Sequence, residues 1–81
     1  MALELAGYAE QAGLAYARGL ERWPQDRNLL MAYGNLLYET GELQAAAASF
    51  TAATQHHPGY APAHNNLAQL LFELGTDGSL L

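Results

Sequence analysis

Four carboxamide side chains are the residues of this sequence best suited to contacting another polypeptide. They are Asn35, Asn65, Asn66 and Gln69. A carboxamide both donates and accepts hydrogen bonds, so it can pair with a peptide backbone whatever side chains the ligand carries. The chemistry these residues offer is therefore recognition of an extended segment.

Three histidines fall within nine residues of one another and invite a metal hypothesis. His56 and His57 are adjacent, so on a helix their side chains diverge, and no Cys or carboxylate lies close in sequence to complete a tetrahedral set with His64. A histidine at a helix C-terminus also interacts favourably with the helix dipole, which explains the pair without a ligand. We expect no metal site.

Catalytic groups are equally sparse. Ser49 and Ser79 are the only serines and neither stands in a nucleophile motif. Four of the carboxylates are spaced as on solvated helix faces, namely Glu4, Glu10, Glu21 and Glu42. We expect neither enzyme activity nor a cofactor.

Composition narrows the class of protein. The 81 residues contain no Ile, Val or Lys and are rich in Ala and Leu, which favours an all-α domain. Eight acidic residues against three basic ones give a net charge of −5, which argues against binding to nucleic acid or to an anionic membrane. The short apolar runs predict a soluble chain with no targeting segment or membrane span, and no compartment is indicated. Arg without Lys is typical of a GC-rich bacterial gene.

An internal repeat of 34 residues positions these side chains. Leu3, Leu37 and Leu71 align at that offset, and so do Gly7, Gly41 and Gly75. Pro24 and Pro58 align as well, which sets the repeat boundaries.

Each repeat reads as two helices. The spacing predicts helices over 27–40 and 43–56, with Asp26 as an N-cap and Gly41 as a left-handed C-cap, so that a short loop makes an antiparallel hairpin. Pro62 suits the first turn of a helix over 61–74. Upstream, residues 2–6 are predicted to be the tail of one helix and residues 8–22 its partner, which gives about five helices.

This pattern resembles the tetratricopeptide repeat. The middle repeat supplies Leu30, Tyr33, Gly34 and Leu37, followed by Ala46, Phe50, Ala53 and Pro58. The last half-repeat supplies His64, Leu67, Ala68 and Leu71, and the first supplies Ala12, Tyr16 and Pro24. His64 departs from the pattern, because it stands in a large aromatic position.

The resemblance implies a right-handed α-α superhelix of antiparallel helical hairpins. We expect a single domain with a partial repeat over 2–24, a full repeat over 27–60, a half repeat over 61–75 and a tail over 76–81. It begins late in one repeat and stops within another, which predicts a fragment of a longer array.

A concave surface lined by the first helix of each repeat is the predicted binding site. Asn35 and Asn66 match the two groove asparagines of peptide-binding members of the family. The expected peptide-binding residues on this surface are Asn35, Asn66, Asn65, Gln69, Met31, Tyr38, Glu39 and Glu73. No Lys or Arg lies among them, so a neutral or basic protein or peptide is favoured over a ligand held by its carboxylate. The other interpretation is that Asn is simply common at these positions.

A second set of residues favours a different role. The last predicted helix lacks a partner, so part of its apolar face is expected to be uncovered. The interface residues predicted there are Leu67, Leu70, Leu71 and Leu74. The predicted function is thus a non-enzymatic interaction scaffold for a peptide or partner protein. The alternative is a structural spacer or oligomerisation module that self-associates through this helix.

Overall fold

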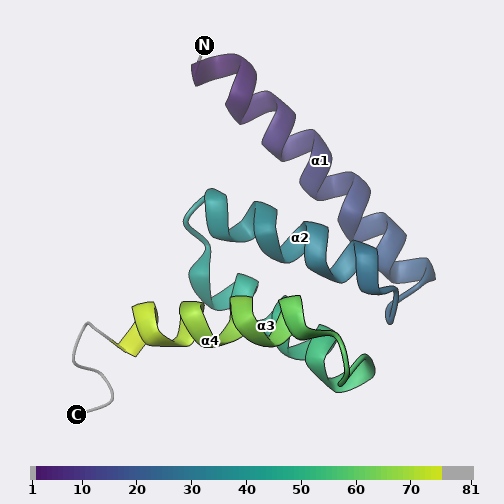
Figure 1. Cartoon of the computed structure of the whole chain (residues 1–81). Coiled ribbons are helices and arrows are strands. Elements are labelled where there is room, and N and C mark those ends of the chain that lie inside the picture. Colours follow the sequence, from purple (N-terminus) through teal and green to yellow (C-terminus); the bar gives the residue numbers. More distant parts are fainter. Residues whose placement is uncertain (1, 76–81) are drawn as a thin grey trace.

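The computed structural model describes residues 2–75, with side chains from Gly7 onward, and within them the chain forms four helices and no strand (Figure 1). The helices are α1 (Ala2–Arg22), α2 (Arg27–Glu39), α3 (Leu43–His56) and α4 (Ala61–Gly75). The all-α prediction is confirmed.

The turn between α2 and α3 forms as the sequence predicts. Gly41 has a φ of 88°, the left-handed conformation that glycine adopts without steric cost. Before it, the Leu37 carbonyl at the end of α2 accepts from the Thr40 hydroxyl at 3.1 Å and from the Glu42 amide at 2.8 Å. At the other end of α2, the Asp26 carboxylate accepts from the Leu29 amide at 2.9 Å, as expected of an N-cap.

The prediction of two helices before residue 23 is wrong. Residues 2–6 and 8–22 belong to one helix, α1, which continues through Gly7. A glycine inside a helix costs about 1 kcal/mol but does not by itself end the helix. Gly41 ends α2 because it takes up a positive φ next to a capping threonine, whereas Gly7 has no positive φ.

Neighbouring helices along the chain pack against one another, so that α1 and α4 lie on opposite sides of α2 (Figure 1). The rings of Tyr16 in α1 and Tyr33 in α2 lie 6.4 Å apart between centroids. Towards its N-terminus α1 diverges from α2 (Figure 1). The stack is therefore tighter at the α3–α4 end than at the α1–α2 end.

The core lies between α2, α3 and α4. Small side chains allow close approach of the helix axes, and larger ones fill the space between them. The buried residues are Leu30, Met31, Gly34, Leu37, Ala46, Ser49, Phe50, Ala53, Ala63 and Leu70. The one polar side chain among them, Ser49, donates its hydroxyl to the Leu30 carbonyl at 2.7 Å, which ties α3 to α2.

Candidate peptide-binding cleft

Two side-chain hydrogen bonds join α2 to α4, the first helices of successive repeats. The Asn66 amide nitrogen donates to the Asn35 Oδ1 at 3.4 Å, and the Tyr38 hydroxyl donates to Glu73 Oε1 at 2.8 Å. Both bonds connect residues more than thirty positions apart in the sequence. The predicted recognition residues on the two helices are thus brought together.

A small cleft of about 110 Å³ lies between these helices. It is lined by Asn35, Tyr38, Phe50, Asn66, Gln69 and Leu70. Phe50 and Leu70 are almost fully buried and form an apolar floor, while the other four residues supply amide and hydroxyl groups. An apolar floor with a few polar groups is the usual composition of a ligand site.

Gly34 determines where the floor of the cleft lies. A Cβ atom at this position would stand 2.5 Å from Cε1 of Phe50, far inside van der Waals contact. The absence of a side chain lets the Phe50 ring of α3 pass beneath α2 and reach the cleft. Both residues belong to the repeat pattern found in the sequence. Their role in the cleft depends on how closely α2 and α3 approach, which the repeat pattern alone does not give.

The Glu73 carboxylate lies beside the cleft and influences Tyr38, one of its lining residues. The hydrogen bond from Tyr38 to Glu73, assisted by desolvation and by the charge of the carboxylate, raises the pKa of Tyr38 above its ordinary value of 10.0. Two of the three arginines are engaged elsewhere, with the Arg27 guanidinium 4.4 Å from the Tyr60 ring centroid and that of Arg22 5.3 Å from the Trp23 ring. Neither lines the cleft.

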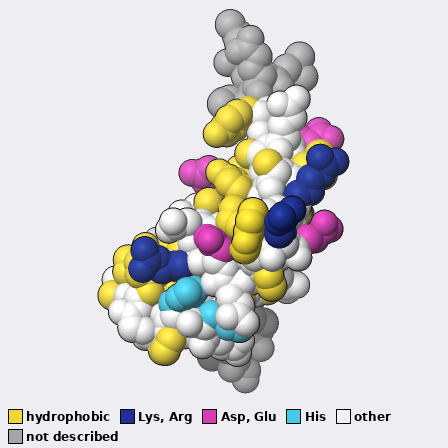
Figure 2. Space-filling view, turned by 90° about the vertical axis from the view of Figure 1, so that its right-hand side faces the viewer, with side chains coloured by type: hydrophobic (Ala, Val, Ile, Leu, Met, Phe, Trp, Pro, Cys, Tyr) yellow, Lys and Arg dark blue, Asp and Glu magenta, His cyan; other side chains and the backbone are white. Residues whose placement is uncertain are grey.

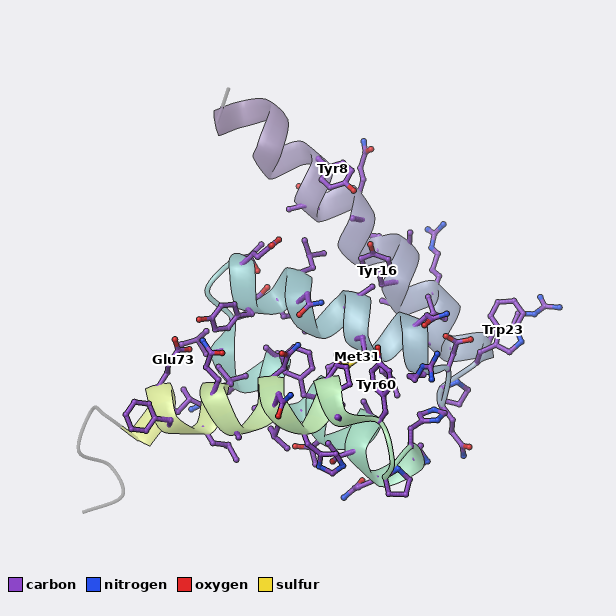
Figure 3. All side chains as sticks on the ribbon, in the orientation of Figure 1. Tyr8, Tyr16, Trp23, Met31, Tyr60 and Glu73 are labelled. Carbon is purple, nitrogen blue, oxygen red and sulfur yellow. The ribbon has the colours of Figure 1, made fainter. Side chains whose placement is uncertain are left out.

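The structure places the remaining predicted recognition residues outside the cleft. Met31 is only 9% exposed and packs in the core, pointing inward among the other core side chains (Figure 3). The sequence predicted Met31 on the binding surface, and its burial in the core became evident only from the packing of the helices. Asn65 and Glu39 are exposed on α4 and α2 but do not line the cleft. Glu73 contributes through its bond to Tyr38 and lies near the end of α4 (Figure 3).

The predicted leucine surface of α4 divides into buried and exposed members. Leu70 is fully buried and belongs to the core, so it is not part of any exposed face. Leu67 and Leu74 are partly buried against the same core. Leu71 is 51% exposed, and Phe72 beside it is 73% exposed. The uncovered apolar part of α4 is thus narrower than the sequence predicted and is centred on these two residues.

The histidines make contacts with the backbone. Nε2 of His57 donates to the Gln25 carbonyl at 2.6 Å and Nε2 of His64 donates to the Pro58 carbonyl at 2.7 Å. Figure 2 shows histidine side chains at the surface in the lower half of one face. Within the described residues, no group of three or more His, Cys, Asp or Glu side chains is arranged to hold a metal ion. No helix among them has both the length and the apolarity needed to cross a bilayer.

Comparison with known proteins identifies the family. The tetratricopeptide repeat model matches residues 6–61 and again residues 34–78. The chain therefore belongs to the tetratricopeptide repeat family, whose members are in general protein–protein interaction scaffolds. Neither curated proteins nor solved structures gave a match to this sequence.

Proposed function

We propose that this chain binds an extended peptide segment, neutral or basic in charge, in the cleft between α2 and α4. The observation that carries the proposal is the Asn35–Asn66 pair above the floor of Phe50 and Leu70. In this pair the Asn35 amide nitrogen and the Asn66 carbonyl oxygen are the amide atoms not used by the mutual bond. They offer one donor and one acceptor to a peptide backbone.

The cleft is too small to hold more than part of a ligand, which fits a segment lying across the surface. An apolar side chain of the peptide would enter the cleft, and the peptide backbone would lie along the carboxamides. Gln69 stands 34 residues after Asn35, so both occupy the same position in successive repeats and extend one row. The Glu73 carboxylate beside the cleft favours a basic over an acidic segment.

The test is a titration followed by nuclear magnetic resonance of the side-chain amides. Neutral, basic and acidic peptides of matched length are added, and we expect the signals of Asn35, Asn66 and Gln69 to shift with the neutral and basic peptides. Asn35→Ala and Asn66→Ala should each weaken binding about tenfold, which corresponds to the loss of a hydrogen bond worth about 1.4 kcal/mol.

The matched control is Gln44→Ala, which removes an exposed carboxamide from α3, outside the cleft. This variant should bind as the unchanged chain does. If no peptide shifts the three amide signals, or if Gln44→Ala weakens binding as much as Asn35→Ala, the proposed cleft is wrong.

A further inference from the structure

The central hairpin shows what a complete contact between the two helices of one repeat looks like. On α2 the contact is made by Leu30, Gly34 and Leu37, and on α3 by Ala46, Ser49 and Phe50. All six residues are buried. The Gly34–Phe50 approach and the hydrogen bond from Ser49 to the Leu30 carbonyl show direct contact between four of these six residues.

The same positions on α4 are open. The counterparts of Leu30, Gly34 and Leu37, 34 residues later, are His64, Ala68 and Leu71, which we call the α4 face. All three are exposed, and the exposed fraction rises from 7% at Leu37 to 51% at Leu71. Helix α4 therefore carries the residues that correspond to the α2 side of this contact, and no helix among the described residues covers them as α3 covers α2.

The opposite half is open on α1. The counterparts of Ala46, Ser49 and Phe50, 34 residues earlier, are Ala12, Ala15 and Tyr16, which we call the α1 face. Ala15 is exposed, and Ala12 and Tyr16 are half-buried, although their counterparts on α3 are all buried. Helix α1 therefore carries the residues that correspond to the α3 side of this contact, and no helix among the described residues covers them as fully as α2 covers α3.

We propose that two copies of this chain associate head to tail, with the α4 face of one copy packed on the α1 face of the next as α2 packs on α3. Shape supports the match, because the small Ala68 would lie opposite the Tyr16 ring as Gly34 lies opposite Phe50. Ala68 carries a Cβ that Gly34 lacks, so the ring must lie slightly further away. The contact between copies is accordingly weaker than the one within the hairpin.

The symmetry of this contact has a direct consequence. Because α1 and α4 lie on opposite sides of the molecule (Figure 1), each copy keeps one face open after the other is used. The association is heterologous, so further copies can add at either end of the assembly until a ring closes. The sequence predicted self-association through the last helix. The contact proposed here instead joins the α4 face of one copy to the α1 face of another. This proposal does not depend on the peptide cleft, whose lining residues belong to neither face.

Charge opposes the association at long range. Each copy has a net charge of −5, so two copies repel each other at low ionic strength. Added salt screens the repulsion between exposed charges and leaves the apolar contact intact. Association should therefore strengthen as the salt concentration rises, whereas an association held by ion pairs would weaken.

The experiment is sedimentation analysis of the 81-residue chain over a range of protein concentrations, with two variants that each damage one face. Leu71→Glu places a charge on the α4 face and Ala15→Glu places one on the α1 face. Both positions are exposed, so circular dichroism should show unchanged helicity. We expect each variant alone to be monomeric, while an equimolar mixture forms a dimer that does not elongate, because each partner still carries one intact face.

Ala48→Glu is the matched control, because Ala48 is an exposed residue of α3 outside both faces. It should associate as the unchanged chain does. A mixture of the two face variants that stays monomeric would overturn the proposal. So would an unchanged chain that is monomeric at every concentration. Loss of association in Leu71→Glu alone, with Ala15→Glu unaffected, would indicate a symmetric contact between two α4 helices and would also overturn it.

Discussion

The two contacts between successive repeats differ although they use the same positions of the repeat. At the α3–α4 contact, Leu70 and Ala63 are fully buried. Their counterparts at the α1–α2 contact, Leu36 and Leu29, are only partly buried. A cavity of about 460 Å³ opens between α1 and α2, lined in part by Gly13 and Leu36.

The physical cause lies in the residues of the second helices. Gly13 in α1 occupies the position that Ala47 occupies in α3, and a Cβ on Gly13 would lie 3.6 Å from Leu36, an ordinary van der Waals distance. Its absence leaves the contact underfilled. The repeat frame therefore determines which residues meet, whereas side-chain volume determines how well they pack.

The largest expected effect comes from removing the aromatic side chain of α3, and it is compared with removing the aromatic side chain at the same repeat position of α1. Phe50→Ala should destabilise the chain by about 3–5 kcal/mol, because it empties the centre of the core. Tyr16→Ala, the same position in α1, should cost only about 1–2 kcal/mol because Tyr16 is half-buried. Urea denaturation followed by circular dichroism measures both. Equal losses would show that the two ends are packed alike.

A pair of glycine substitutions should give effects of opposite sign. Gly34→Ala forces the new Cβ against the Phe50 ring, and the overpacking should exceed the gain in helix propensity, for a net loss of about 1–2 kcal/mol. Gly13→Ala adds a methyl group at contact distance from Leu36 and should stabilise the chain by about 1 kcal/mol. The denaturation midpoints should move in opposite directions. A Gly13→Ala variant less stable than the unchanged chain would contradict the account of an underfilled contact.

The smallest effect concerns the hydrogen bond between Tyr38 and Glu73. Because the bond needs the protonated phenol, the pKa of Tyr38 is raised. Its contribution to stability is therefore fully present below the ordinary tyrosine value of 10.0 and is lost as pH rises through the raised value. Alkaline titration followed by phenolate absorbance, with Tyr38→Phe subtracted, should give a midpoint above 10.0 for this one of the five tyrosines.

Glu73→Gln is the control for this titration. It removes the negative charge that accepts the bond, so the midpoint assigned to Tyr38 should move back towards 10.0. A midpoint that does not change in Glu73→Gln would show that the carboxylate does not hold the phenol.

Much of the fold could be predicted because its signals are local. The caps at Asp26 and Gly41 mark the ends of α2, and the 34-residue offset specifies where each helix recurs. The prediction failed at Gly7, where the repeat frame implied a turn and the chain continues as helix. A glycine permits a turn without requiring one, so its position in the frame was not sufficient.

The candidate site was predictable in its polar part only. Asn35, Tyr38, Asn66 and Gln69 line one cleft, because residues on one face of successive first helices share a surface. Met31 and Leu70 are buried in the core, although the sequence predicted both on surfaces that contact a partner. The packing of neighbouring helices decides which side of each helix is covered.

The sequence by itself determined the helical class, the repeat length and the polar residues of the cleft, because these follow from periodicity and residue type within one or two turns. Tertiary structure alone decided the depth of the Phe50 floor, the burial of Met31 and the openness of the α1 and α4 faces. Burial is a property of two surfaces in contact. Identical positions of the repeat are therefore buried or exposed according to the helix that lies beside them.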